Sequence, residues 1–327
     1  MRSWNRIEEE SMQRKIDEFL KDVNTVAIAG HVNPDGDCVG SCMGMYLYLR
    51  DNYPEISADV YLEKPRSSFD MIEDIDKARQ VCSAIRYDLL ILLDISSQDR
   101  IGVAGALLKT ADRVLCLDHH KTNRDHYTWL FNYPDLSSTC EVVWNFLDPE
   151  KISEKCAEAL YMGIVHDTGV FQYSCTSPRT MRIAASLMEK GIPFSRIVDS
   201  TYYEKTFIQN QLLGRALMES FLMFGGKMIV SCIRKKDMDF YNALPADMDG
   251  IVSQMRNTAG VEVSVFMYEL ETGKWKVSLR SVDKVDVSVV AQIYGGGGHA
   301  RAAGVTMQGS CYDVVNNLTL YLEKELV

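Results

Sequence analysis

The sequence predicts an α/β protein with a doubly wound, mainly parallel sheet followed by a smaller α/β domain. In the first half, short unbroken apolar runs alternate with helical patterns, which is typical of parallel strands that are buried on both faces. In the second half, strands follow one another more closely, and residues 269–273 are expected to join two of them as a hairpin. A chain of 327 residues is long enough for two such cores.

The elements are expected in the following order. The N-terminal domain begins with an amphipathic helix over 7–23 and continues with strands over 26–29, 58–62, 88–94 and 113–118 and helices over 38–50, 138–146, 155–165 and 180–190. A helix stop at Gly191-Ile192-Pro193 and a short helix over 194–203 indicate a linker. The C-terminal domain should hold strands over 227–234, 261–268 and 274–281 and helices over 286–294 and 312–326. We therefore assign domains to 1–187 and 206–327, with a helical linker over 188–205.

Ionisable side chains follow the strands of the first domain at the points where those strands end. They are His31, Asp35 and Asp37 after the first strand, Asp94 after another, and Asp118, His119 and His120 after a third. Because parallel strands end at the same edge of a sheet, we expect these side chains to converge. Asp167, at the end of a helix, is the remaining candidate.

Two carboxylates as close as Asp35 and Asp37 repel each other unless a cation lies between them. A divalent ion relieves this repulsion, and a nearby imidazole favours Mn, Fe or Zn over Ca. Taken alone, the loop could instead be a turn in which an Asp caps the next helix. The other strand-end residues favour a metal site, and with one shared carboxylate they suffice for two cations. Such a pair, about 3.5–4 Å apart, is typical of phosphoester hydrolysis.

A second group of residues lies near the C-terminus, where Gly295, Gly296, Gly297 and Gly298 precede His299. We expect these glycines to form a loop, in which backbone N–H groups can approach an anion closely, although the segment could also be a flexible hinge. His299, together with Arg280 on a neighbouring strand, favours phosphate binding. His166 and Arg179 are weaker candidates, because a supporting or surface role explains each of them equally well.

Composition limits the classes of function. The net charge of −10 disfavours binding to long duplex nucleic acid and favours a small phosphorylated substrate. No apolar run approaches the roughly 20 residues that span a bilayer, and the N-terminus lacks the apolar core of a signal peptide. Nine cysteines without a C-x-x-C pair argue against a disulfide framework. We therefore expect a cytoplasmic protein that does not associate with membranes.

The order of these motifs resembles that of the DHH phosphoesterases. Residues His31 to Asp37 resemble the first motif of that family, Asp94 the second, Asp118-His119-His120 the third and Asp167-Thr168-Gly169 the fourth. The segment Gly295 to His299 resembles the signature of the DHH-associated C-terminal domain. Within the family, chain length and this C-terminal domain are most similar to those of the bacterial nanoRNases, which also act on 3′-phosphoadenosine 5′-phosphate.

The resemblance implies roles for individual residues around a pair of divalent ions, most simply manganese. His31, Asp35 and Asp94 would hold one ion, and the other would be held by Asp37, Asp94, His119 and Asp167. Asp118 would orient its neighbours, and His120 would contact a phosphate oxygen. In the cleft between the domains, the substrate would be held by Arg280, Ser281, Gly295, Gly296, Gly297, Gly298 and His299. His166 departs from the small or hydroxyl residue expected before Asp167.

The expected function is hydrolysis of short oligoribonucleotides to mononucleotides, together with removal of the 3′-phosphate from 3′-phosphoadenosine 5′-phosphate. A phosphodiesterase for linear or cyclic dinucleotide messengers is the nearest alternative. A pyrophosphatase is disfavoured, since that branch has a different C-terminal domain. A nucleotide- or RNA-binding module without activity would be indicated by a missing metal ligand, and none is missing. A homodimer is retained as a candidate assembly.

Overall fold

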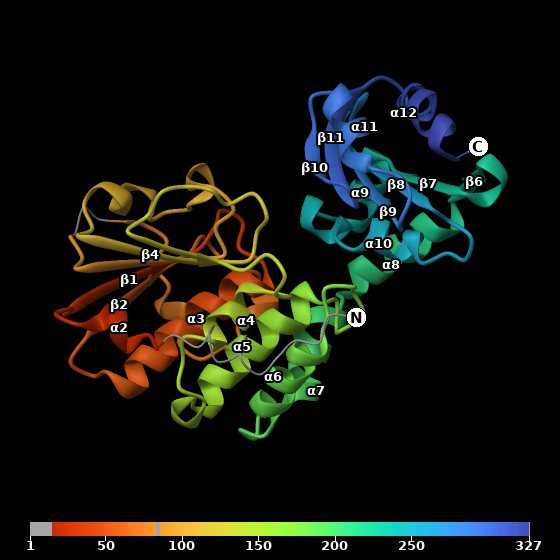
Figure 1. Cartoon of the computed structure of the whole chain (residues 1–327). Helices are drawn as coiled ribbons and strands as arrows, with labels where there is room; N and C mark the ends of the chain where they lie inside the picture. Colours follow the sequence, from red (N-terminus) through yellow and green to blue (C-terminus); the bar gives the residue numbers. More distant parts are fainter. Residues whose placement is uncertain (1–14, 83–85, 327) are drawn as a thin grey trace. The chain divides into compact units, whose positions relative to one another are not determined.

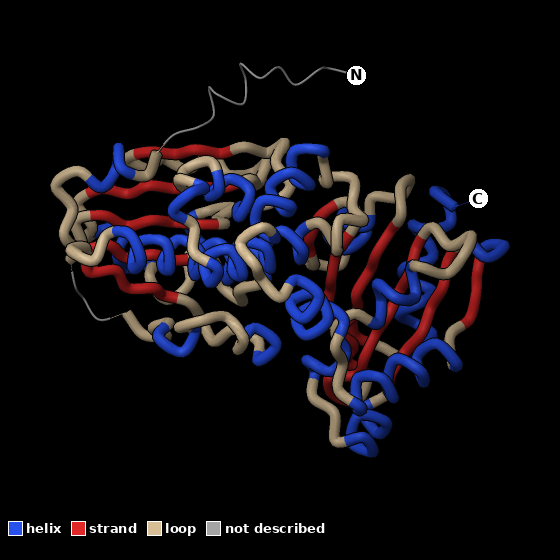
Figure 2. Tube along the Cα trace, turned by 90° about the horizontal axis from the view of Figure 1, so that it is seen from below, coloured by secondary structure: helices blue, strands red, loops and turns tan. Residues whose placement is uncertain are grey.

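The computed structural model describes residues 15–82 and 86–326. The chain divides into two compact units that meet in the sequence at Glu204 and Lys205, and each unit has its own sheet (Figures 1 and 2). No helix of the described segments is both long and apolar enough to cross a bilayer.

The first unit is built on a five-stranded sheet in which every pairing is parallel. The strand order is β2-β1-β3-β4-β5, with bounds β1 (Thr25–Ala29), β2 (Ser57–Tyr61), β3 (Leu89–Leu93), β4 (Arg113–Asp118) and β5 (Trp129–Asn132). The order reverses between β1 and β3, and the carboxyl ends of strands at such a switch point are where open α/β sheets bind ligands.

Helices cover one face of this sheet (Figure 1). They are α3 (Gly36–Asn52), α4 (Thr139–Trp144), α5 (Glu154–Asp167) and α6 (Pro178–Met188), and Ile28, Ile91 and Leu117 of the strands lie in the core that they share. On the opposite face, Leu90 and Leu92 pack in a smaller core with Leu107 of η4 (Gly105–Lys109). The predicted doubly wound α/β class is confirmed, although 3₁₀ turns take the place of long helices on this second face.

Helices α3, α4 and α5 pack closely where they contact one another, and this packing brings Asp37 next to α4 and α5. A Cβ atom on Gly163 of α5 would lie 2.2 Å from Sγ of Cys140 and 3.0 Å from Oδ1 of Asp37. A Cβ on Gly40 would lie 2.5 Å from the carbonyl oxygen of Ala159. Because any larger side chain would push these helices apart, glycine at the contact determines how near α5 can come to the start of α3.

The two ends of the first unit differ in detail from the prediction. Residues 7–14 of the helix expected over 7–23 lie outside the described residues, and over 15–23 the structure forms only the short helix α2 (Asp17–Leu20). The short helix predicted after residue 194 is α7 (Phe194–Val198), and it continues as one π-helical turn, η6 (Asp199–Tyr203). A π-helical turn is rare and often accompanies a functional position.

The second unit contains a six-stranded mixed sheet in the order β10-β11-β9-β8-β7-β6. Only β7 and β8 pair in parallel. The strands are β6 (Phe221–Met223), β7 (Met228–Ile233), β8 (Val263–Glu271), β9 (Lys274–Ser281), β10 (Gly297–His299) and β11 (Ala302–Gln308). Two layers of helix complete the unit: α8 (Phe207–Met218), α9 (Lys235–Tyr241) and α10 (Ile251–Arg256) pack with one core, and α11 (Val287–Ile293) and α12 (Cys311–Leu326) with the other.

The glycine-rich segment is more regular than the loop that the sequence predicts. Residues Gly297 to His299 form β10, which pairs antiparallel with β11 at the edge of the sheet. Gly298 has a φ of 146°, and a Cβ there would lie 2.4 Å from the carbonyl oxygen of Ala302. Glycine at this position therefore permits the tight approach of the two strands, which the sequence alone did not reveal.

Candidate active site

The loop after β1 presents His31 and Asp35 towards the end of β3. Nδ1 of His31 donates a hydrogen bond to the carbonyl oxygen of Val32 at 2.8 Å, which leaves Nε2 available as a ligand. This Nε2 lies 3.3 Å from Oδ2 of Asp94 and 3.6 Å from Oδ1 of Asp35. Asp35 also caps α3, since its Oδ1 accepts from the backbone N–H of Cys38 at 3.1 Å. The capping turn and the predicted ligand cluster thus occur together.

Asp94 stands at the centre of the arrangement. It follows β3 with a φ of 60°, a left-handed conformation that is uncommon for a residue with a side chain, and it is only 2% exposed. Its Oδ2 faces His31, whereas its Oδ1 lies 3.7 Å from Nε2 of His119 and 3.5 Å from Nδ1 of His120. The two oxygens of one carboxylate therefore face two different groups of side chains.

The second group consists of Asp37, His119 and Asp167. Nε2 of His119 lies 3.1 Å from Oδ2 of Asp167 and 3.9 Å from Oδ2 of Asp37. Asp37 lies in the first turn of α3 rather than on the preceding loop and is completely buried. Each of its carboxylate oxygens accepts one backbone hydrogen bond and retains a lone pair for a further partner.

Those backbone donors come from the start of α4, which sequence reasoning did not connect to the site. The N–H of Thr139 donates to Oδ2 of Asp37 at 2.6 Å, and that of Cys140 donates to Oδ1 at 2.9 Å. The hydroxyl of Thr139 donates to Oδ1 of Asp94 at 3.1 Å. Thr139 thus orients one carboxylate from each of two separate strand ends. It carries no motif of its own, and the only signal nearby is the capping serine, Ser138, whose side chain accepts from the N–H of Glu141.

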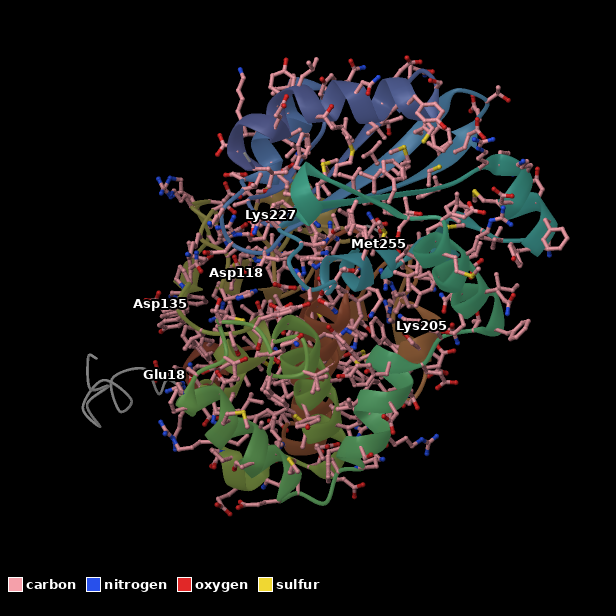
Figure 3. The ribbon with its side chains drawn as sticks, turned by 90° about the vertical axis from the view of Figure 1, so that its right-hand side faces the viewer. Glu18, Asp118, Asp135, Lys205, Lys227 and Met255 are labelled. Carbon is pink, nitrogen blue, oxygen red and sulfur yellow. The ribbon has the colours of Figure 1, made fainter. Side chains whose placement is uncertain are left out.

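His120 and Asp118 form a second hydrogen-bonded chain at the end of β4, where Asp118 is labelled in Figure 3. Nδ1 of His120 lies 2.8 Å from Oδ1 of the buried Asp118. The other oxygen of Asp118 accepts from Nδ2 of Asn123 at 2.9 Å. This contact directs Nε2 of His120 away from Asp118 and leaves it free to meet a ligand. Asn123 is another supporting residue that the sequence analysis overlooked.

The pKa values of the site residues are shifted because several buried carboxylates lie close to one another and to imidazoles. Burial works against a charged His119, but Asp167, Asp37 and Asp94 outweigh it and raise the pKa of this imidazole to about 10. Desolvation opposes ionisation of Asp35, but the contact with His31 lowers its pKa to about 2. Burial and the neighbouring Asp167 and Asp94 raise the pKa of Asp37. Negative charge here therefore requires compensating cations.

The donor set fits divalent metal ions. Among the described residues, three clusters of candidate ligand atoms have members within 4.8 Å of one another: His31, Cys38 and Asp94; Asp94, His119 and His120; and Asp37, His119 and Asp167. Imidazole nitrogen mixed with carboxylate oxygen suits Mn, Fe or Zn. Burial raises the pKa of the Cys38 thiol well above its usual value, and a protonated thiol is a poor ligand. Asp35 is the better partner for His31.

The predicted substrate-binding residues belong to the second unit. Residues Arg280 of β9, Ala302 of β11 and His299 of β10 occupy one register row across three neighbouring strands. The guanidinium of Arg280 donates to the carbonyl oxygen of Leu279 at 2.9 Å. Ser281 is buried, and its hydroxyl donates to the carbonyl oxygen of Val285 at 2.6 Å. The single hydroxyl hydrogen of Ser281 is therefore engaged in holding the adjacent turn.

His166 and Arg179, the two weaker candidates, make contacts that hold structural elements of the first unit together. Thr201 donates to the carbonyl oxygen of Ile197 at 2.7 Å, so its hydroxyl oxygen accepts from Nε2 of His166 at 3.0 Å. His166 thereby connects the end of α5 to the π-helical turn. Arg179 contacts the fully buried Glu141 through its Nε at 3.1 Å. This ion pair gives Arg179 a structural contact inside the first unit.

Comparison with known proteins agrees with this geometry. The N-terminal domain of the DHH family matches residues 25–164, and the DHHA1 domain matches residues 225–325. The bifunctional oligoribonuclease and PAP phosphatase NrnA of Thermus thermophilus is 29% identical over 301 residues, which cover 90% of this chain and 88% of the relative. The protein of the same description from Bacillus subtilis is 26% identical over 289 residues, covering 87% of this chain and 90% of the relative.

A solved structure shares the whole fold. An exopolyphosphatase-related protein from Bacteroides fragilis superposes with a TM-score of 0.86 at 23% identity, with 99% of this chain and 98% of that chain covered. RecJ of Thermus thermophilus, solved with Mn²⁺, matches 97% of this chain and 54% of its own length at 13% identity and a TM-score of 0.54. At these identities the likeness concerns the fold.

A parallel α/β domain with carboxylates and imidazoles gathered at its switch point, followed by a mixed-sheet domain, defines a hydrolase that acts on phosphoester bonds. The two family matches together cover well over half of the chain, and the chain belongs to the DHH family. The family predicted from the motifs is confirmed.

Replacement of Thr139 tests the orienting role of α4. Thr139→Val keeps the shape of the side chain and the backbone N–H bond to Asp37 but removes the hydroxyl that donates to Asp94. We expect the affinity for Mn²⁺, measured by calorimetry, to fall about 10- to 100-fold, as is usual when a group that orients a metal ligand is lost. Thr139→Ser, which keeps the hydroxyl, is the control. Equal affinities of the two variants would show that this hydrogen bond does not position Asp94.

Proposed function

We propose that the protein is a two-metal phosphodiesterase that hydrolyses short oligoribonucleotides, dinucleotides included, to mononucleotides. The observation that carries the proposal is the shared carboxylate of Asp94, whose two oxygens face His31 on one side and His119 on the other. The NrnA relatives, described as oligoribonucleases and PAP phosphatases, support the same substrate class. We extend the proposal to removal of the 3′-phosphate from 3′-phosphoadenosine 5′-phosphate, and we place the activity in the cytoplasm.

Two divalent ions, most simply Mn²⁺, are proposed to occupy the site. His31, Asp35 and Asp94 would hold one ion, and Asp37, Asp94, His119 and Asp167 the other. When bound, such a pair lowers the pKa of water and offsets the negative charge that develops on a phosphate during hydrolysis. The chain itself contributes the alignment: Thr139 and Cys140 fix Asp37, and the backbone contact of His31 fixes its tautomer.

His120 is proposed to bind a non-bridging oxygen of the scissile phosphate. Burial opposes protonation of His120, but the hydrogen bond to Asp118 and the charge of Asp94 raise the pKa of the imidazole. An imidazolium held by Asp118 through Nδ1 can donate from Nε2 to a phosphate oxygen. Asp118 acts through His120, because its carboxylate contacts His120 and Asn123.

The C-terminal unit is proposed to recognise the substrate beyond the reacting phosphate. A guanidinium pairs with phosphate oxygens in two parallel hydrogen bonds, which makes Arg280 the principal candidate. We propose that the glycine segment from Gly295 to His299 approaches the same group closely, since small residues there leave the backbone accessible. Ser281 contributes by holding the turn that contains Val285. This division leaves the chemistry to the first unit and selection to the second. A homodimer is the assembly we propose for the enzyme.

Cleavage of a 5′-labelled RNA dinucleotide in the presence of Mn²⁺ tests the proposed activity. The unmodified protein should release the labelled mononucleotide, and a chelator should abolish release. Asp94→Asn removes the negative charge that both clusters share and one of the two carboxylate oxygens. We expect kcat to fall at least a hundredfold. Asp99→Asn, a change of the same kind on an exposed acid that follows the same strand, is the control and should retain activity. A folded, metal-loaded protein that leaves the dinucleotide intact would refute the proposal.

Arg280→Ala tests the role of the second unit. Because the interaction is made with a phosphate remote from the reacting centre, we expect KM for the dinucleotide to rise about tenfold or more while kcat changes less. Lys276→Ala is the matched control, since Lys276 lies on the same strand and the same face, four residues away. Identical KM values for the two variants would remove Arg280 from the binding site.

A further inference from the structure

Three sulfur-containing side chains meet in the second unit, and the proposed function uses none of them. Cys232 on β7 lies opposite Met267 on β8 in the strand register. Sγ of Cys311, the first residue of α12, lies 3.9 Å from Sδ of Met267. Cys232 and Cys311 therefore both lie beside Met267, and each thiol shifts the pKa of the other. Two cysteines that are 79 positions apart in the sequence are thus neighbours in the fold.

This thiol pair is accessible. Both cysteines are partly exposed and line a cavity of about 370 Å³, together with Ser231, Arg234 and Tyr312. The cavity lies beyond the point where β6 stops pairing, because Phe221 pairs with Val230 and β7 continues past it. A small solute can therefore reach the sulfur atoms without unfolding of the sheet.

The surroundings favour a reactive thiolate on Cys311. The neighbouring thiol of Cys232 and the charge of Arg234 outweigh burial and Glu269, and the pKa of Cys311 falls to about 7. The neighbouring Cys311, together with burial, raises the pKa of Cys232, which therefore keeps its proton. Thiolates rather than thiols are the nucleophiles in oxidation reactions. Cys311 is therefore the nucleophile that reacts first, and Cys232 is the neighbouring thiol that can react with the product.

Cys38 and Cys42 provide an internal comparison within the first unit. The neighbouring thiol of Cys42 likewise raises the pKa of Cys38, but both residues are completely buried. Burial raises the pKa of Cys38 well above its usual value, so it remains a thiol. Cys232 and Cys311 therefore differ from Cys38 and Cys42 in their exposure to solvent, and the pKa of Cys311 is lowered where that of Cys38 is raised, whereas both pairs consist of neighbouring thiols.

We propose that Cys232 and Cys311 form a redox-active pair that a small hydroperoxide oxidises to an intramolecular disulfide. The Cys311 thiolate attacks the peroxide, its sulfur gains one oxygen as a sulfenic acid, and the O–O bond breaks to release hydroxide or alkoxide. The Cys232 sulfur then attacks Cys311, the S–S bond forms, and the sulfenic oxygen leaves as water with the proton of Cys232. Two thiols are oxidised and one hydroperoxide is reduced.

The disulfide would join β7 to the start of α12. This helix packs on the sheet through Val314, Leu318 and Leu322, and its first residue is the one that would be tethered. A cross-link between distant positions restricts the unfolded chain, so it should stabilise the second unit against unfolding. Oxidation of the pair would therefore increase the free energy of unfolding of the domain that carries the proposed substrate-binding residues.

Peptide mapping of the full-length protein after brief treatment with hydrogen peroxide tests the proposal. Remaining thiols are alkylated after unfolding and identified by mass spectrometry. We expect Cys232 and Cys311 to lose alkylation together and to appear as one cross-linked peptide pair, which a reductant restores. Cys38 and Cys42 should remain fully alkylated. Oxidation of the exposed Cys175 while Cys232 and Cys311 stay reduced would overturn the proposal.

Single variants separate the roles of the two cysteines. In Cys232→Ser the reaction should stop at the sulfenic acid, which dimedone would label on Cys311. In Cys311→Ser, Cys232 should acquire less dimedone label than Cys311 acquires in Cys232→Ser, because burial still raises the pKa of Cys232. Equal dimedone labelling of Cys232 and Cys311 in these two variants would contradict the assignment of Cys311 as the attacking residue.

Discussion

The crowding of carboxylates at one edge of a parallel sheet is the constraint on which the rest of the structure depends. Asp35, Asp37, Asp94 and Asp167 are gathered around two imidazoles, and Asp37 and Asp94 are buried. Buried charge is costly unless it is compensated, so the site needs cations to be stable in its ionised form. Because the two oxygens of Asp94 face two separate clusters of side chains, we propose one divalent ion in each cluster.

The scaffold holds this unfavourable arrangement through contacts that are not themselves reactive. Asp94 adopts a left-handed backbone conformation at the end of β3, and the hydroxyl of Thr139 fixes its carboxylate. Gly163 allows α5 to lie against Asp37 and Cys140. Backbone donors from α4 replace the water that Asp37 would otherwise bind. Geometry that costs energy locally is thus maintained by packing elsewhere, as is common at functional sites.

The sequence predicted the parts of the structure that follow from local patterns. Apolar runs placed β1, β3 and β4, and their shared direction explains why His31, Asp94 and His119 could be expected at one edge. It did not reveal Thr139, because its contact with Asp37 joins positions 102 residues apart and no motif marks it. The strand β5 escaped notice because it is short and only half-buried. The glycine segment was expected as a loop, since its pairing with β11 depends on a close approach that only coordinates reveal.

Anomalous X-ray scattering can show whether Asp94 is shared between two metal ions, as we propose. Crystals of the full chain grown with Mn²⁺ can be measured on both sides of the manganese absorption edge. We expect two anomalous peaks, one beside His31 and Asp35 and one beside Asp37, His119 and Asp167, with Asp94 in contact with both. A single peak, or two peaks of which neither contacts Asp94, would contradict the proposal.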